Sequence, residues 1–150
     1  MLAAALALAL ALASPPHGLV DAAPLVPDAL LDVQYATADN FTGRRLYPEA
    51  RCLLLGAVAE RLARAAARLR REGLRLRIHD CYRPLSVQRE MWAAFPRRGY
   101  VADPARGSSH NRGAAVDVAL ATPEGGTVET PTADDALDRR AHAGASGGGP

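Results

Sequence analysis

The 150-residue sequence contains no lysine, few aromatic residues and only two cysteines. Because lysine is absent, all 18 basic residues are arginine, and the formal net charge is only +2. No dense basic run with interleaved aromatic residues is present, which argues against a nucleic-acid-binding protein. Aromatic residues make up 5% of the chain, and alanine inflates the hydrophobic share of 49%. The length therefore allows one domain whose core is poor in large side chains.

The sequence also lacks an apolar run long enough to span a bilayer. Residues 1–13 hold only alanine and leucine after the initial methionine, which is too short for a membrane span. The run is similar to the apolar region of a secretory signal, with an A-x-A cleavage pattern at residues 11–13, although a positively charged start is missing. We therefore expect a signal peptide at 1–13, a linker at 14–27, and a periplasmic or secreted protein. A cytoplasmic location is the alternative, if the run is only an alanine-rich extension.

The two cysteines, Cys52 and Cys81, do not have the spacing of a zinc site. In an exported chain they could form a disulfide. We favour the simpler interpretation that both are buried thiols, Cys52 at the start of an apolar helix and Cys81 after a strand.

The spacing of apolar residues predicts two helices and a strand between them. A helical stripe runs through residues 49–72, and Gly73 stands where glycine commonly ends a helix. Residues 74–80 alternate between apolar and polar side chains, which predicts a half-buried strand. Residues 86–95 predict a second helix, with Ser86 as its N-cap.

The most informative stretch is residues 108–120, which carries His110 and Asp117. Gly113 allows the backbone to turn between them. Beyond this turn, Val118 and its apolar neighbours at every second position predict a strand that turns its apolar face to a core. An imidazole and a carboxylate suit a divalent metal such as zinc, although a catalytic zinc usually takes three protein ligands. The alternative is a loop histidine that caps a turn and a strand aspartate paired with an arginine.

Two further side chains, Arg83 and Tyr35, each fit two different roles. Arg83 follows the predicted strand, and Pro84 biases it towards extended geometry. An arginine fixed there can present a charged fork to a carboxylate or a developing oxyanion, whereas the simpler alternative is a surface arginine. Tyr35 is one of the few large side chains in its region, and it fits either a core or the lining of a pocket.

Three motifs carry a family resemblance. They are Y-A-T-x-D-N-F-T-G at residues 35–43, D-x-Y-R-P at 80–84 and G-S-S-H-N-R-G-x-A-V-D at 107–117. In this order they resemble the zinc D-alanyl-D-alanine dipeptidases of the VanX type, and the resemblance runs from about residue 28 to residue 142.

The resemblance implies an α+β fold, with helices packed on a small, mostly antiparallel sheet around a zinc cleft. It implies hydrolysis of the dipeptide D-Ala-D-Ala, in cell-wall turnover or glycopeptide resistance, with Zn²⁺ as the cofactor. His110 and Asp117 fall on the family's first two zinc ligands, and Arg83 falls on the arginine that stabilises the tetrahedral transition state. The positions near those that hold the dipeptide are Tyr35, Ser108 and Asp135, the last facing the ammonium group.

The chain departs from the family pattern at its end. The family completes its site with a C-terminal Glu-x-x-His, which supplies the general base and the third zinc ligand, and this motif is not found here. We therefore expect an incomplete dipeptidase-like domain at 28–142, a disordered tail at 143–150, weak zinc binding and little or no dipeptidase activity. The alternative is a non-catalytic fragment, or a relative that binds a peptide or a metal.

Overall fold

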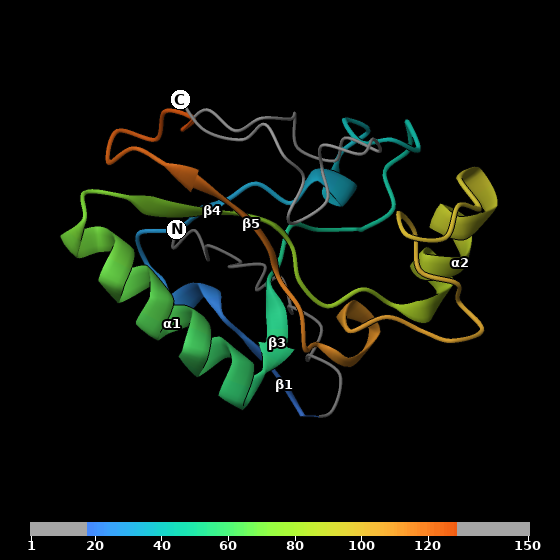
Figure 1. The fold of residues 1–150 in the computed structure, drawn as a ribbon, viewed down its shortest axis with the longest axis horizontal. Helices are drawn as coiled ribbons and strands as arrows, with labels where there is room; N and C mark the ends of the chain where they lie inside the picture. Colours follow the sequence, from blue (N-terminus) through green and yellow to red (C-terminus); the bar gives the residue numbers. More distant parts are fainter. Residues whose placement is uncertain (1–17, 129–150) are drawn as a thin grey trace, which may run out of the picture.

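The computed structural model describes residues 18–128, and it confirms the expected α+β fold (Figure 1). Two α-helices and three single 3-10 turns accompany five short strands. The helical elements are α1 (Gly56–Arg71), α2 (Leu85–Ala94), η1 (Ala23–Leu25), η2 (Gln34–Ala36) and η3 (His110–Arg112). The strands are β1 (Leu19–Asp21), β2 (Leu30–Leu31), β3 (Leu53–Leu55), β4 (Arg75–Asp80) and β5 (Asp117–Ala121).

The strands form two small sheets. β1 pairs with β3 in an antiparallel ladder, while β4 lies between parallel β2 and antiparallel β5. The register of β4 and β5 shifts between Ile78 and Asp80, so that Asp80 lies opposite Asp117. This irregularity sets two carboxylates beside each other at the end of the sheet from which the chain leaves towards α2 (Figure 1).

The first helix begins later than predicted. The expected helix at 49–72 starts only at Gly56, because Leu53–Leu55 pairs with β1 as strand β3. The end is confirmed: the helix stops at Arg71, and Gly73 adopts a left-handed φ of 72°. The helical spacing of apolar residues thus continues into residues 53–55, although pairing with β1 makes this segment a strand.

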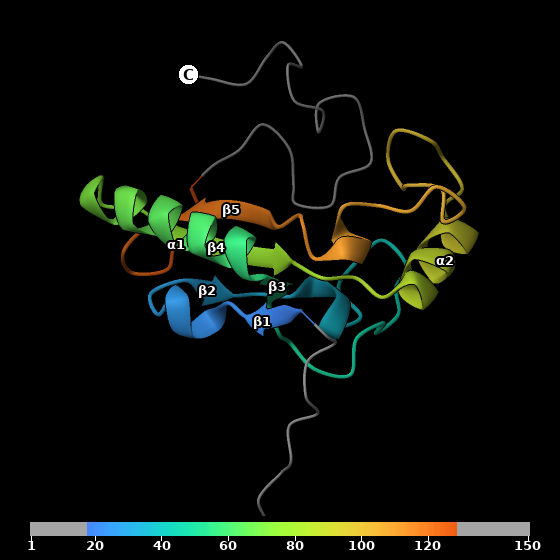
Figure 2. The same cartoon turned by 90° about the horizontal axis from the view of Figure 1, so that it is seen from below.

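The second helix is confirmed in place, but its predicted cap is wrong. α2 begins at Leu85 after Pro84, and no side chain caps its first turn, so Ser86 lies within the helix. Val87 and Met91 are buried as predicted. Figure 2 shows α1 and α2 at opposite ends of the molecule.

Two hydrophobic clusters hold the described residues together. One joins α1, β3 and β4, and its buried members are Ala22, Val26, Cys52, Leu54, Ala59, Leu62, Ala66, Leu76, Ile78 and Cys81. The other lies between η2 and α2, and its buried members are Val33, Tyr35, Tyr47, Val87, Met91 and Val101. No helix in residues 18–128 is long and apolar enough to cross a membrane.

The two cysteines form a disulfide, so the predicted pair of buried thiols is wrong. Cys52 does not open a helix; it directly precedes β3, and Cys81 directly follows β4. The sulfur atoms meet because β3 and β4 pack in the same cluster, a contact that the local sequence does not reveal.

The buried face of β5 also differs from the prediction. Val118 lies opposite the buried Ile78, yet Val118 is 43% exposed, because α1 packs over β4 rather than over β5. The alanine face is buried instead, at Ala119 and Ala121. Ala119 lies opposite Arg77, whose guanidinium donates to a carbonyl in the turn beyond β5, so the arginine stem crosses over the alanine.

The turn at Gly113 supports a first stability prediction. Gly113 has a φ of 66°, and an added Cβ would meet the side chain of Leu19 and lie 3.3 Å from the backbone nitrogen of Leu55. Gly43 has a similar φ of 64°, with nothing within 4 Å of an added Cβ. Both substitutions by alanine incur the left-handed backbone cost, about 1–2 kcal/mol. Gly113→Ala is expected to lower the free energy of unfolding by about 1–3 kcal/mol more than Gly43→Ala, because it also overpacks the turn. Denaturant titration measures both values, and equal losses would contradict the prediction.

Candidate metal centre

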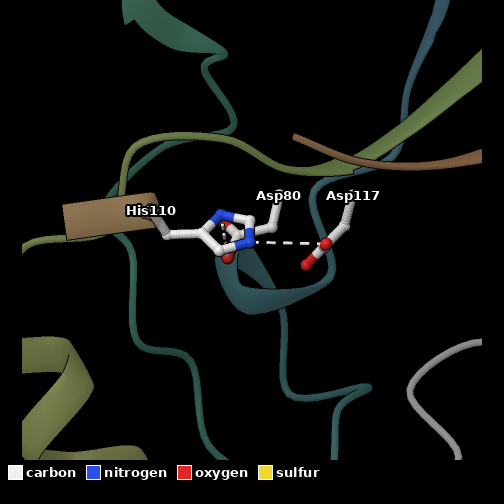
Figure 3. A group of neighbouring side chains, drawn as sticks. All are labelled: Asp80, His110 and Asp117. Carbon is white, nitrogen blue, oxygen red and sulfur yellow. Dashed lines mark ion pairs between the residues drawn. The ribbon is translucent and has the colours of Figure 1, made fainter. Parts of the chain in front are cut away.

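Three side chains that could hold a metal converge where the central sheet ends. Asp80 is the last residue of β4, Asp117 is the first of β5, and His110 comes from η3 on the loop that precedes β5 (Figure 3). Each offers one ligand atom, and these atoms all lie within 4.8 Å of one another. The antiparallel pairing of β4 and β5 brings the two aspartates together, and η3 places His110 beside both of them.

A backbone carbonyl orients the imidazole of His110. Nδ1 lies 2.8 Å from the carbonyl oxygen of Cys81, and Nε2 lies 3.3 Å from Oδ1 of Asp117. Since a carbonyl oxygen can only accept, Nδ1 carries a proton and donates it. Nε2 is then the atom that can bind a metal beside Asp117, which is the usual arrangement for a metal-binding histidine.

His110 and Asp117 shift each other's pKa. Burial alone would lower the pKa of His110, but the hydrogen bond and the charge of Asp117 outweigh it and raise the pKa. For Asp117, burial would raise the pKa, but the hydrogen bond and charge of His110 lower it. At a pH below the raised pKa of His110, the two groups form an ion pair in the metal-free protein, in which the proton on Nε2 occupies the place that a metal would take.

Asp80 is committed to other partners. Its Oδ2 accepts from Nε and Nη2 of Arg83 at 3.0 and 2.6 Å, and its Oδ1 accepts from the Tyr47 hydroxyl at 2.7 Å and from the Cys81 amide at 2.9 Å. These four donors use the acceptor sites of the carboxylate. Burial raises the pKa of Asp80, and the charge of Arg83 opposes that shift. We conclude that His110 and Asp117 are the better ligand pair and that Asp80 holds Arg83.

Arg83 is 7% exposed, so its alternative interpretation as a surface arginine is excluded. Its Nη1 donates to the buried Gln88, which in turn donates to the carbonyl of Ala102. Its Nη2 lies 4.0 Å from Oδ2 of Asp117. A guanidinium held by Asp80 and Gln88 thus lies beside the candidate ligand Asp117, where a permanent positive charge can stabilise developing negative charge.

The sequence matches the protein-family model described as D-ala-D-ala dipeptidase over residues 16–149, nearly its full length. The chain belongs to this family. It is 39% identical over 125 residues to a D-alanyl-D-alanine dipeptidase of Escherichia coli K12, an alignment that covers 83% of this chain and 65% of that protein. It is 32% identical over 140 residues to a D-alanyl-D-alanine dipeptidase of Enterococcus faecium, covering 77% of this chain and 68% of that protein. The chain therefore spans about two thirds of the length of these relatives.

The dipeptidase resemblance also predicted three residues that hold the dipeptide, and the structure describes two of them, Tyr35 and Ser108. Tyr35 is buried, with its ring centroid 5.5 Å from Cζ of Arg83, so it belongs to the core and also contacts the candidate site. The Ser108 hydroxyl accepts from the amide of His110 at 3.1 Å and thereby supports the turn that presents the histidine. Their roles towards a dipeptide stay predictions. Asp135 lies outside the described residues.

Several supporting residues of this dipeptidase-family site were not identified from the sequence. Asn111 accepts from the amide of Ser108 and donates to the carbonyl of Arg83, which joins the two motif loops. The sequence weakly indicated a role for Gln88, since it is a polar residue beside Val87 on the buried side of the predicted helix. It indicated no role for Tyr47, because the hydrogen bond of Tyr47 to Asp80 joins residues 33 positions apart.

The mutual pKa shift of His110 and Asp117 supports a prediction for the metal-free protein. Although burial opposes the shift, Asp117 is expected to raise the midpoint of the His110 titration above the ordinary pKa of 6.5. The pair therefore stabilises the fold below the ordinary histidine pKa, and this contribution is lost as the pH rises through the raised pKa of His110. On the acid side, it is lost as the pH falls through the lowered pKa of Asp117.

An NMR titration of the histidine ring protons measures the midpoint directly. Asp117→Asn should lower the pKa of His110, whereas Asp28→Asn, at an ion pair with Arg70 on α1, should leave it unchanged. A midpoint at or below 6.5 in the parent protein would contradict the assignment.

Proposed function

We propose that this protein is a zinc-dependent hydrolase of the dipeptide D-alanyl-D-alanine, with His110 and Asp117 as metal ligands. The observation that carries the proposal is the convergence of a correctly oriented imidazole, a carboxylate and a buried guanidinium at one point. Membership of the D-Ala-D-Ala dipeptidase family supports the substrate class. The donor set suits zinc, which accepts imidazole nitrogen and carboxylate oxygen and favours a histidine whose other nitrogen is hydrogen-bonded.

Each side chain has a distinct task in this proposal. A zinc ion at the site would polarise the carbonyl group of the substrate's peptide bond. It would also lower the pKa of a water molecule bound to the zinc towards neutrality. The guanidinium of Arg83 faces the same point and stabilises the oxyanion of the tetrahedral transition state, a contribution on the order of 3 kcal/mol in comparable sites. Asp80 and Gln88 keep the guanidinium in place, so that it does not reorganise as the charge develops.

We propose Tyr35, Ser108 and Asp135 as the residues that hold the dipeptide. Tyr35 lies beside Arg83, and Ser108 supports the backbone of His110, so both are next to the point where a substrate carbonyl would lie. The proposed setting is cell-wall turnover or glycopeptide resistance in a periplasmic or secreted protein. The Cys52–Cys81 disulfide supports this location, since disulfides persist mainly in oxidising compartments.

Release of D-alanine from D-Ala-D-Ala by the purified chain tests the function. Any release of D-alanine should require zinc: it should be lost after dialysis against a chelator and should return when zinc is added back. L-Ala-L-Ala is the matched control substrate and should not be cleaved. The expectation of low activity for this 150-residue chain remains a prediction, and the measured rate tests it. Zinc-dependent binding of D-Ala-D-Ala without release of D-alanine would instead favour a non-catalytic relative.

A further inference from the structure

Cys81 contacts the candidate metal centre through its backbone. Its amide donates to Oδ1 of Asp80 at 2.9 Å, and its carbonyl oxygen accepts from Nδ1 of His110 at 2.8 Å. Its side chain forms the disulfide with Cys52. One residue therefore touches the carboxylate that holds Arg83, the imidazole that would bind the metal, and a covalent cross-link.

The cross-link attaches this residue to a separate part of the fold. Cys52 directly precedes β3, which pairs with β1, whereas Cys81 follows β4, which belongs to the other sheet. No β-ladder therefore holds residue 81 against residue 52. Cys52 is fully buried, and its carbonyl accepts from the amide of Ala22, so the anchoring side of the cross-link is itself fixed in the core.

The segment from Cys81 to Pro84 belongs to no helix or strand. Its other backbone bonds to neighbouring elements run from the Tyr82 amide to Leu53, from the Arg83 amide to His110 and from the Gln88 amide of α2 to the carbonyl of Pro84. The second of these returns to the site and does not anchor the segment elsewhere. The Cys81 carbonyl and the Tyr82 amide belong to one planar peptide unit, so this carbonyl is tied to the β3 region by two contacts, the disulfide and the Tyr82–Leu53 hydrogen bond. The disulfide is the covalent one of the two.

We propose that the Cys52–Cys81 disulfide positions the metal centre by holding the residue 81 carbonyl against Nδ1 of His110, which leaves Nε2 turned to Asp117. Figure 3 shows the imidazole of His110 with Nε2 directed at Asp117. The inference rests on the proposed metal role of His110 and Asp117. Without the cross-link, the Tyr82–Leu53 hydrogen bond is left to hold this acceptor against β3, so the carbonyl is less firmly fixed and the tautomer with the proton on Nε2 becomes populated. A metal must then displace that tautomer, so its apparent affinity falls.

Nitrogen-15 NMR of the histidine rings in the metal-free protein tests the positioning directly, since it distinguishes the two neutral tautomers. Spectra are recorded at a pH where the ring is neutral, for the parent and for Cys52→Ala/Cys81→Ala. The control is Leu54→Ala, which opens a cavity in the same core cluster but leaves the disulfide in place, so it also lowers the global stability through lost burial. Zinc affinity is measured for all three by competition with a chromophoric chelator.

The parent and Leu54→Ala should show a single tautomer with the proton on Nδ1, and the double variant should show a mixture. Zinc affinity should fall about tenfold in the double variant, the lower end of the effect of losing a partner that orients a ligand, and should not change in Leu54→Ala. An unchanged tautomer in the double variant, or equal changes in both variants, would overturn the proposal.

A second variant, Cys52→Val/Cys81→Ala, restores most of the lost side-chain volume and is used if the first does not fold. If neither variant folds, the disulfide determines the whole fold rather than the histidine, and the proposal is overturned. The tautomer readout needs neither zinc nor substrate. It therefore separates failure of this inference from failure of the proposed dipeptidase function, which the parent's zinc binding and D-alanine release test on their own.

Discussion

Replacing His110 by alanine is expected to weaken zinc binding by at least about 100-fold and to abolish release of D-alanine. Within residues 18–128 the imidazole is the one nitrogen donor of the candidate site, and its Nε2 lies 3.3 Å from the carboxylate of Asp117. Loss of a residue that only orients a metal ligand costs 10–100-fold in affinity or activity, so loss of the ligand itself costs at least as much. Zinc affinity measured by chelator competition and the initial rate of D-alanine release report the two effects separately.

The matched control is Arg112→Ala in the same 3-10 turn. Arg112 is exposed, and its guanidinium donates to the hydroxyl of Ser109, away from the candidate ligands. This variant should keep the parent's zinc affinity. Zinc affinity retained in His110→Ala would remove the histidine from the ligand set. Equal losses in both variants would show that the turn, rather than the imidazole, is responsible.

Replacing Asp80 by alanine is expected to lower the free energy of unfolding of the metal-free protein by about 3–5 kcal/mol. Asp80 is 1% exposed and accepts two hydrogen bonds from Arg83, which is itself buried. Its removal takes away the carboxylate that is hydrogen-bonded to the guanidinium, leaving Asp117 at 4.0 Å as the nearest counter-charge, and it leaves the hydroxyl of Tyr47 without its acceptor. The large value reflects this stranded charge, and it is not the net contribution of the ion pair to stability.

Asp32→Ala is the control for this prediction. Asp32 pairs with Arg77 at 3.1 Å, but its side chain is 49% exposed, so the loss should stay below about 1 kcal/mol. Denaturant unfolding of the three proteins measures the difference. A loss below about 1 kcal/mol for Asp80→Ala would mean that water reaches Arg83 and that the buried network is not tight.

The two large predictions concern opposite sides of one site. In the proposed function His110 would bind the metal, whereas Asp80 holds Arg83, and Cys81 connects the two side chains through its carbonyl and its amide. Asp80→Ala should therefore also reduce catalysis, since a guanidinium that must reorganise stabilises an oxyanion less well. Zinc affinity should change far less in Asp80→Ala than in His110→Ala, because the carboxylate of Asp80 is committed to other donors.

Local patterns in the sequence determined much of the fold and the identity of the candidate ligands. The helical stripe placed α1 and its end at Gly73, and the alternation at residues 74–80 placed β4. The motif residues His110 and Asp117 were identified because their types and order match the family. These features depend on neighbours within one or two turns of chain, where periodicity and backbone preference act.

Only the tertiary structure decided which distant groups meet. β3 forms in place of a first helical turn because β1 offers it a partner, and Val118 is exposed because α1 covers β4 instead of β5. The disulfide forms because two sheets pack against one another. The pairing of Asp80 with Tyr47, across 33 positions, follows from the packing of the second core cluster. Burial and charge pairing are properties of the packed chain, so the sequence by itself predicted His110 and Asp117 as candidate ligands, and the fold decided which groups orient these side chains.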